Sequence, residues 1–458
     1  MKQTILLSIS AMLLLCSRSP VAAQDVKAQR LRVSDNHRFI VYEDGSPFFW
    51  LGDTGWELFQ RLDKQEADKY LETRAQQGFT VIQAVVLAEL NGLTDPNANG
   101  DLPLENNDPN RPNEAYFRQV DYIVQKAASL GIYIAMLPTW GDKINKSSWG
   151  AGPEIFNITN ARTYGKYLGK RYRHQWNIVW VLGGDRNPRG QGDMDIWRAL
   201  AAGITEGVGS RDSVLMTFHP QPHDPGGSSA WFQNDDWLDF NMNQTGHCKD
   251  QPIYDKIAYD YSLQPVKPTL DGEPLYEDHP ICFDAKKYGF SDADDIRKDF
   301  YWDLFAGAFG VTYGCHDVWQ MYQPGKAAVN GARRYWYEAL RLPGAEQMKF
   351  VKKLMLSRPY LERIPDPSLI LTKQRKDSTY CIGTRAADGS YAFVYTPTGE
   401  KLDINTTSLK GRHLKVSWYN PRNGDLSPAK KAKKTPAMYF TPPTSGDGKD
   451  WILVLDAN

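Results

Sequence analysis

The stretch VLGGDRNP, residues 181–188, ends a run of buried-strand character at two glycines and then presents a carboxylate, Asp185. The run Asn177–Gly183 is short and apolar, which is typical of a parallel strand covered on both faces. The glycines allow the backbone to approach a ligand closely. The stretch therefore predicts an α/β fold in which Asp185 stands just beyond the end of a strand.

The same unit, a short apolar strand followed by an amphipathic helix, recurs along the chain. Helices are expected at Asp63–Gln77, which stops at Gly78, and at Asn113–Leu130. Eight units predict a (β/α)8 TIM barrel, because an open doubly wound sheet usually stops at five to seven strands. The expected strands are Phe48–Asp53, Phe79–Leu87, Ile132–Leu137, Asn177–Gly183, Ser213–Phe218, Leu238–Met242, Pro268–Leu270 and Gly310–Tyr313.

The pattern changes beyond about Pro359, where helical periodicity gives way to short alternating runs such as 391–395 and 414–418. Asp388-Gly389 lies between two such runs, as expected for a hairpin turn. We therefore predict a catalytic barrel over residues 24–358 and a small C-terminal β-sandwich over residues 359–458. The run 430–434, KKAKK, is interpreted as a solvated loop in that domain.

The first 23 residues combine an early lysine, a short apolar run and a V-A-A end, which predicts a cleavable signal peptide and a mature chain starting near Gln24. A lipoprotein anchored through Cys16 is the alternative, although Leu15 is large for that position. The protein is therefore expected to be secreted or periplasmic. Four cysteines remain in the mature chain without a C-x-x-C pair, so we expect isolated or singly bridged cysteines and no zinc site.

The chain has 54 basic and 54 acidic residues, which gives no footprint for nucleic-acid binding, and no further apolar run is long enough to span a membrane. One segment, DPNANGD at residues 95–101, matches the first half of a calcium loop. It has Asn106 where that loop needs a glutamate, so we interpret it as a turn. We predict no metal and no cofactor.

Active sites of TIM barrels lie at the carboxyl ends of the strands, and two of these ends carry carboxylates. Asp185 follows the fourth strand, and TLDGEP ends the seventh with Asp271 and Glu273, two residues of the same parity. One protonated and one ionised carboxyl group are what glycoside hydrolysis requires. Arg186 complicates the assignment, because a close cation would keep Asp185 ionised unless its side chain points to substrate. Strand-capping acids that pair with arginine are the alternative.

Nearly every other strand end carries a hydrogen-bonding or ring-stacking side chain. Any single one of them is more often structural, but together they describe a sugar subsite. The candidate substrate-binding residues are Asp53, Trp56, Trp140, Arg186, His219, Gln244, His247, His316 and Trp319.

The ordered set FFWLGDTGWELF, GGDRNP, NQTGH, DGEPLYE and GVTYGCHDVWQ resembles glycoside hydrolase family 140, the apiosidase-like barrels followed by a β-domain labelled collagen-binding. The resemblance covers nearly the whole mature chain. It implies cleavage of the bond between apiose and galacturonic acid in the pectin rhamnogalacturonan II. It also implies that Asp185 is the general acid/base, that Glu273 is the nucleophile, and that the anomeric configuration is retained.

An anionic galacturonan would need cations near the pocket mouth, and the candidates are Arg186, Arg189, Lys143 and Lys249. Two alternatives stay open. Another TIM-barrel glycosidase, such as an arabinofuranosidase or an endoglucanase, would use the same carboxylates with a differently shaped pocket. A glycan-binding protein would use the barrel only as a platform.

Overall fold

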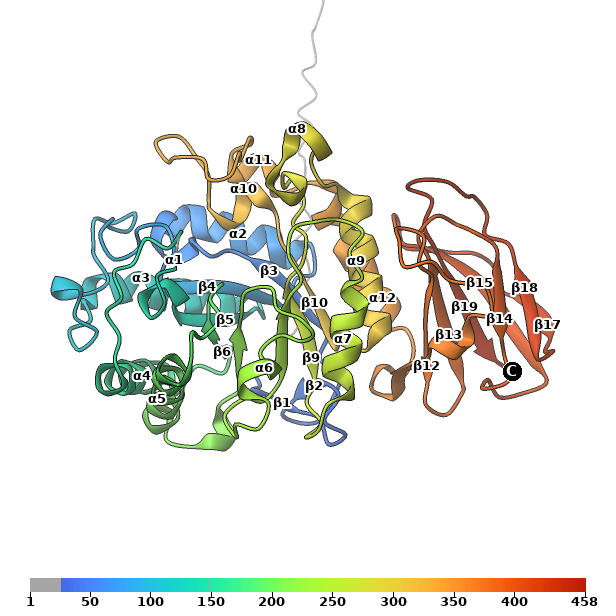
Figure 1. Cartoon of the computed structure of the whole chain (residues 1–458), viewed down its shortest axis with the longest axis horizontal. Coiled ribbons are helices and arrows are strands. Elements are labelled where there is room, and N and C mark those ends of the chain that lie inside the picture. The colour runs from blue at the N-terminus through green and yellow to red at the C-terminus, as the bar shows by residue number, and fades with distance from the viewer. Residues whose placement is uncertain (1–25, 148) are drawn as a thin grey trace, which may run out of the picture.

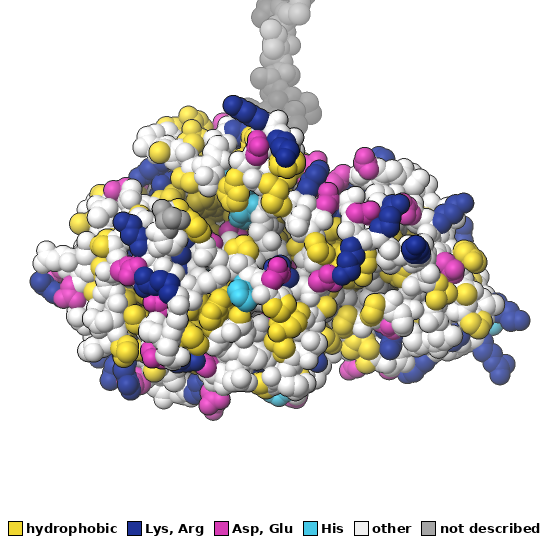
Figure 2. Space-filling view, in the orientation of Figure 1, with side chains coloured by type: hydrophobic (Ala, Val, Ile, Leu, Met, Phe, Trp, Pro, Cys, Tyr) yellow, Lys and Arg dark blue, Asp and Glu magenta, His cyan; other side chains and the backbone are white. Residues whose placement is uncertain are grey.

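The computed structural model describes residues 26–147 and 149–458 (Figure 1). The predicted signal peptide and Cys16 lie outside the described residues. Among the helices that the structure describes, none is both long and apolar enough to cross a membrane. Figure 2 shows acidic and basic side chains interspersed over one face of the molecule, in line with the even charge balance of the chain.

Within the described residues, eight parallel strands surround the core of the first domain. Six of them pair in the order β10-β3-β4-β5-β6-β7, and β8 pairs with β9. Strand β7 lies beside β8 and β9 lies beside β10, so the ring closes although the ladder is interrupted at these two places. This confirms the predicted TIM barrel. The strands are β3 (Trp50–Thr54), β4 (Val81–Leu87), β5 (Tyr133–Thr139), β6 (Ile178–Gly183), β7 (Met216–His219), β8 (Asn241–Gln244), β9 (Thr269–Glu273) and β10 (Gly310–Tyr313).

Helices follow the strands and cover the outside of the ring (Figure 1). The α-helices are α1 (Leu58–Arg61), α2 (Lys64–Gln76), α3 (Glu114–Ser129), α4 (Ile158–Tyr172), α5 (Gln191–Val208), α6 (Ser229–Phe232), α7 (Ile253–Ser262), α8 (Ala285–Tyr288), α9 (Ala293–Ala306), α10 (His316–Trp319), α11 (Trp336–Ala339) and α12 (Pro343–Met355). Short 3-10 turns are η1 (Glu105–Asn107), η2 (Gly141–Lys143), η3 (Arg211–Ser213), η4 (Ile281–Phe283), η5 (Tyr360–Glu362) and η6 (Pro367–Leu369). A hairpin, β1 (Leu31–Val33) with β2 (Ile40–Tyr42), precedes the barrel.

Two strands begin three residues later than predicted, and β5, β8 and β9 extend two or three residues further than predicted. The predicted strand at 213–218 starts only at Met216, and the one at 238–242 starts at Asn241. Their leading apolar residues are buried outside the ladder, so burial alone did not mark the strand. Strand β9 continues to Glu273, because Asp271 and Glu273 themselves pair with residues of β8.

The second domain is an antiparallel sandwich, as predicted. One sheet has the order β11-β12-β13-β19-β15-β16 with β17 beside β15, and β14 pairs with β18. Leu402 and Ile404 of β14 pack against Leu453 and Leu455 of β19 between the sheets. The strands are β11 (Arg363–Pro365), β12 (Ile382–Ala386), β13 (Tyr391–Thr396), β14 (Leu402–Asn405), β15 (His413–Asn420), β16 (Asp425–Leu426), β17 (Lys430–Lys433), β18 (Ala437–Phe440) and β19 (Trp451–Ala457).

The structure confirms one local prediction in this domain and corrects another. Gly389 has a φ of +74° in the turn between β12 and β13, as expected for the Asp388-Gly389 hairpin. The lysine-rich run is not a loop, because residues 430–433 form β17 and pair with β15. Its three lysines are exposed, and lysines are common on edge strands because they oppose pairing with other chains.

The sandwich packs on helix α9, which follows the strand that carries Glu273. Tyr301 and Phe305 of α9 stack on Tyr395 and Phe393 of β13 at ring-centroid distances of 4.9 and 6.3 Å. At one end of this contact, the buried Arg297 of α9 meets Asp450. Its Nε and Nη2 each lie 3.0 Å from a carboxylate oxygen of Asp450. The C-terminal domain is therefore anchored to the barrel by an aromatic stack and a buried ion pair.

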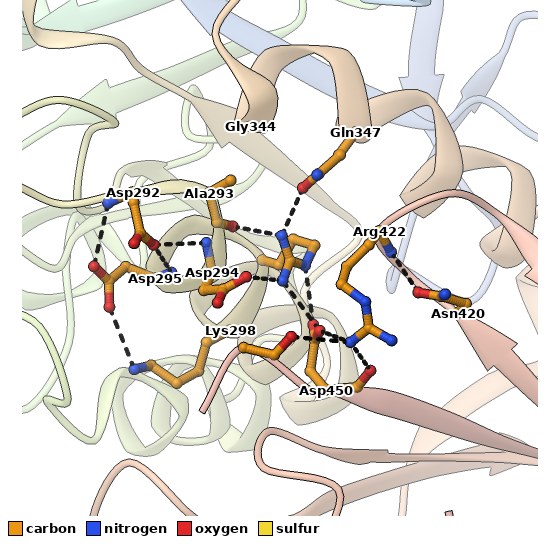
Figure 3. A network of polar contacts seen from close by, with 12 residues as sticks. Asp292, Ala293, Asp294, Asp295, Lys298, Gly344, Gln347, Asn420, Arg422 and Asp450 are labelled. Carbon is orange, nitrogen blue, oxygen red and sulfur yellow. Dashed lines mark hydrogen bonds and ion pairs between the residues drawn. The ribbon is translucent and has the colours of Figure 1, made fainter. Parts of the chain in front are cut away.

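Asp450 also forms an ion pair within its own domain, because Arg422 Nη1 lies 2.8 Å from its Oδ1 (Figure 3). We expect Asp450→Ala to lower the free energy of unfolding by about 3 kcal/mol, because it removes the buried carboxylate that pairs with Arg297 and leaves only the more exposed Asp294 as its counterion. Urea unfolding followed by tryptophan fluorescence measures the change. Asp35→Ala, which removes an exposed pair with Arg32, is the matched control and should leave the unfolding curve unchanged. Equal curves for the two variants would contradict this anchor.

Candidate active site

The turn after β6 explains why the strand ends in Gly-Gly-Asp. Gly183, Gly184 and Asp185 have φ values of +88°, +113° and +50°, so three consecutive residues adopt the left-handed conformation. A Cβ on Gly183 would collide with the carbonyl of His219, and one on Gly184 would lie 2.7 Å from the Trp140 ring. The Gly184 N–H donates to the His219 carbonyl at 2.9 Å. The turn is thereby pinned to β7 and presents Asp185 above the strand ends.

Glu273, the last residue of β9, faces two histidines. His219 Nε2 lies 3.1 Å from Glu273 Oε2, and His247 Nε2 lies 3.3 Å from Oε1. The Glu273 backbone N–H donates to Asp271 Oδ1 at 3.1 Å, so the other acid of TLDGEP fixes the backbone of the strand end. Thr245 also donates to the Asp271 carboxylate, whose charged neighbours include Asp299 and Asp303 of α9. Asp271 therefore supports the strand end, while the buried Glu273 faces the two histidines.

His219 connects the two candidate catalytic residues. The Asp185 backbone N–H donates to His219 Nδ1 at 3.4 Å, while Nε2 faces Glu273. A proton on Nε2 is compatible with both contacts, because Nδ1 then accepts from Asp185 while Nε2 faces the carboxylate of Glu273. Trp56 and Trp140 hold this ring, with centroids 5.4 and 6.1 Å from it.

The surroundings give the two carboxyl groups opposite character. Burial raises the pKa of Asp185 to about 6, and the charge of Glu273 adds to this rise, although Arg186 and His219 oppose it. Burial would also raise the pKa of Glu273, but the contacts with His219 and His247 outweigh it and hold that pKa at about 2. One carboxyl is therefore protonated in mildly acidic solution while the other is ionised. This is the division that hydrolysis by two carboxylates requires.

Several predicted site residues lie around this pair. Trp56 and Trp140 are buried and pack on each other at 5.1 Å as the aromatic wall behind His219. Gln244 ends β8 opposite Glu273, with a buried Oε1 that has no hydrogen-bond partner among the described residues. Arg186 Nη1 lies 3.2 Å from Asp185 Oδ2, and its guanidinium lies 4.6 Å from the ring of the exposed Trp149.

Three other predicted residues have contacts that point to structural roles. The carboxylate of Asp53 is fully buried, pairs with Arg74 at 2.6 Å and accepts a hydrogen bond from Tyr70. His316 Nε2 faces the carbonyls of residues 329 and 330 at 3.1 Å, and its Nδ1 accepts from Trp319 at 3.3 Å. We therefore leave Asp53, His316 and Trp319 out of the sugar-binding set proposed below.

Of the four candidate cations, Arg186 lies closest to the chemistry. Lys143 is buried, paired with Asp142 at 2.7 Å and bonded to a backbone carbonyl. Arg189 pairs with Asp193 and Glu154, both at 2.9 Å. Lys249 lies 4.0 Å from a carboxylate oxygen of Asp295. Only Arg186 keeps two buried nitrogens without a hydrogen-bond partner among the described residues.

The sequence analysis missed three features of the site. Tyr276 packs on His247 at 4.7 Å and lies close enough to Glu273 for that charge to raise the pKa of its phenol, after burial. Glu89, beyond the end of β4, lies beside Asp185. A disulfide joins Cys248 to Cys282 next to His247, so two of the four mature cysteines pair with each other across two site loops. Tyr276 lies in the quoted DGEPLYE motif, which could have signalled it; nothing in the local sequence marks the other two.

No metal site emerges from the described residues, since they contain no cluster of three or more His, Cys, Asp or Glu side chains that could hold an ion. The segment 95–101 is a turn, as predicted. Its Asn97 Oδ1 accepts the backbone N–H groups of Asn99 and Asp101, both at 3.0 Å.

A TIM barrel with one protonated and one ionised carboxyl group at its strand ends is the arrangement of a glycoside hydrolase. Residues 34–362 match the family described as "Apiosidase-like, catalytic domain", and the chain belongs to that family. Residues 364–456 match the family described as "Putative collagen-binding domain of a collagenase".

Solved structures agree with this class. One, named "Glycoside hydrolase", is 32% identical with a TM-score of 0.85 and covers 94% of this chain and 97% of its own. A glycoside hydrolase family 5 protein from Bacteroides vulgatus ATCC 8482 is 34% identical with a TM-score of 0.84 and covers 93% of each chain. No curated protein sequence matches the chain.

Proposed function

We propose that the chain is a retaining glycosidase in which Asp185 is the general acid/base and Glu273 the nucleophile. The observation that carries the proposal is the opposite character of the two carboxyl groups, with pKa values of about 6 and about 2. The charge of Glu273 also raises the pKa of Asp185, so the two carboxyl groups lie near one another. Retaining enzymes place them about 5–5.5 Å apart.

In this mechanism, Asp185 protonates the glycosidic oxygen while Glu273 attacks the anomeric carbon, so the bond to the leaving group breaks as a glycosyl ester forms. The ionised Asp185 then takes a proton from water, which attacks the same carbon and releases Glu273. His219 and His247 keep Glu273 ionised and aimed. Trp56, Trp140, Gln244 and Arg186 form the wall and the polar contacts of the sugar pocket.

We propose apiose linked to galacturonic acid, in rhamnogalacturonan II, as the substrate, which corresponds to glycoside hydrolase family 140. The apiosidase-like family match supports this assignment. Arg186 supports it as well, because a uronate could engage the guanidinium nitrogens that the described residues leave unpaired. The test must distinguish this enzyme from another TIM-barrel glycosidase and from a glycan-binding platform.

We also propose that the protein is secreted or periplasmic after its signal peptide is removed. The disulfide between Cys248 and Cys282 supports an oxidising compartment.

The test is sugar release from rhamnogalacturonan II, from arabinan oligosaccharides and from 4-nitrophenyl glycosides of xylose, arabinose and galactose. We expect release of apiose-terminated side chains from rhamnogalacturonan II, detected by chromatography, and little turnover of the other substrates. Preferred release of arabinose would instead assign an arabinofuranosidase. Tight binding without any hydrolysis would favour the glycan-binding platform.

A further inference from the structure

His247, one of the two histidines that face Glu273, lacks the hydrogen bond that usually orients such a ring. Its Nε2 lies 3.3 Å from Glu273 Oε1, while its buried Nδ1 has no hydrogen-bond partner among the described residues. The direction of a working histidine is normally set by a hydrogen bond at its second ring nitrogen. His219 has one, because its Nδ1 accepts the Asp185 backbone N–H at 3.4 Å. A different contact must therefore set the direction of His247.

The ring of His279 lies flat against the ring of His247 and provides this contact. The two ring centroids are 4.3 Å apart, and the ring planes differ by 24°. Tyr276 and Phe283 also touch His247, but they meet it tilted or edge-on, at 4.7 and 5.6 Å. In a close-packed interior, a ring cannot turn without displacing the ring stacked on it. The stack with His279 therefore restricts the rotation of His247.

His279 is itself held in one position. Its side chain is buried, and its Nδ1 lies 2.8 Å from the carbonyl of Pro280, so Nδ1 carries a proton and donates it. The His279 backbone N–H donates to Ser291 Oγ, and its carbonyl accepts the N–H of Ser291, both at 3.0 Å. The ring of His316, at the start of α10, meets the His279 ring edge to face at 4.4 Å. His279 is thus a rigid support for His247.

This support carries no charge. Burial lowers the pKa of His279 far below its usual value, and the charges of His247 and His316 lower it further. Burial likewise lowers the pKa of His316 to about 4. Both rings are therefore neutral near pH 6, where the pKa of Asp185 lies. His279 offers His247 a flat neutral face and adds no charge of its own near Glu273.

We propose that His279 is a positioning residue: by stacking on His247, it aims Nε2 of that ring at Glu273 and so keeps the proposed nucleophile ionised and oriented. Among the described residues, no hydrogen bond or ion pair joins His279 to Glu273, so its effect passes through His247. Without the stack, His247 could turn away, and one of the two contacts that lower the pKa of Glu273 would be lost.

The test separates the ring of His279 from its hydrogen bond. His279→Phe keeps a flat ring without a donor, whereas His279→Asn keeps a donor for the Pro280 carbonyl without a ring. We expect kcat within about threefold of wild type for His279→Phe, and kcat about 10-fold lower with KM within about twofold for His279→Asn. His223→Asn is the matched control, because His223 Nδ1 lies 3.1 Å from the carbonyl of Gly226 and its ring packs on Trp231 at 4.8 Å.

The pH profile distinguishes positioning from a merely structural role. Glu273 must be ionised to attack, and its pKa is about 2 because two histidines face it. Loss of the His247 contact raises this pKa, so the acid limb of kcat/KM should move up by about one pH unit in His279→Asn and stay in place in His279→Phe. A variant that is only less stable would lose activity without moving this limb. The titratable groups that face Glu273 are Asp185, His219, His247, Asp271 and Tyr276, and His247 is the one whose ring stacks on His279.

Two results would overturn the proposal. One is a His279→Asn variant with the kcat and the acid limb of wild type. The other is a His279→Phe variant as impaired as His279→Asn, because the hydrogen bond to Pro280 would then be what matters. If thermal unfolding shows that His279→Phe does not fold, the acid limb of His279→Asn decides alone.

The role of His279 rests on the proposed two-carboxylate hydrolysis, so the kinetics use the panel substrate that the wild type cleaves fastest. A wild type that cleaves none of the panel defeats that function. An active wild type whose acid limb stays in place in His279→Asn defeats only the role of His279.

Discussion

Glu273→Gln should lower kcat by at least about 10⁴-fold, because the amide cannot attack the anomeric carbon. Gln has nearly the same shape, so the variant should still bind substrate and KM should change little. The two histidines that now face a carboxylate, at 3.1 and 3.3 Å, would face a neutral amide instead. The measurement is steady-state hydrolysis of the best panel substrate, with thermal unfolding as the check on folding. Glu105→Gln, in an exposed pair with Arg111, is the control.

Azide can establish the role of Glu273 more directly. In Glu273→Ala, azide should occupy the space of the missing carboxylate and displace nitrophenolate from an activated glycoside in one step. The product would be a glycosyl azide of inverted configuration, which proton NMR identifies. A Glu273→Gln variant that keeps more than a tenth of the wild-type kcat would contradict the assignment and move the nucleophile elsewhere.

The barrel could be predicted from the sequence because each buried parallel strand appears as a short apolar run followed by an amphipathic helix. The exact strand limits could not. Val214 and Leu215 are buried beside β7 without joining its ladder, so apolar character extended the predicted strand too far. The run 430–433 reads as a loop in the sequence because three of its four residues are lysine and show no apolar alternation, whereas an edge strand exposed on both faces needs none.

The two catalytic candidates could be predicted because the sequence shows where a strand ends. The sequence does not show in which direction each neighbouring side chain points. Asp53 and Asp185 both belong to polar strand ends, yet Asp53 points to Arg74 of α2. His219 could be suspected, but its contact with both candidate catalytic residues depends on the left-handed turn at 183–185. Glu89 was missed because it lies beside Asp185 only in the folded chain, and the two residues are nearly one hundred positions apart in the sequence.

The pairing of the cysteines could not be predicted from the sequence either. Cys248 and Cys282 lie in the loops after β8 and β9, and no local spacing connects them. In the structure, the Cys282 N–H donates to the carbonyl of His247 at 2.8 Å. The bridge therefore helps to hold His247, which faces the proposed nucleophile Glu273, and the two cysteines come together only in the folded barrel.

Asp185→Asn should reduce hydrolysis of the natural glycoside by about 10²–10⁴-fold, the usual contribution of a general acid. The loss should be smaller for the first step with a nitrophenyl glycoside, because nitrophenolate leaves without protonation. The wild type should show kcat/KM falling about tenfold per pH unit above about pH 6, since Asp185 must be protonated and its pKa is about 6. This alkaline limb should be absent from the variant, because asparagine does not titrate in this range.

The dependence of kcat/KM on pH distinguishes the role of Asp185 from that of Glu273. Glu273 has a pKa of about 2 and stays ionised throughout the range above, so its titration cannot cause a fall near pH 6. Azide added to Asp185→Ala with a nitrophenyl glycoside should give a glycosyl azide of retained configuration, because it attacks the ester on Glu273. An unchanged alkaline limb in Asp185→Asn would transfer the acid/base role to another group, and Glu89, the neighbouring carboxyl, would be the first to examine.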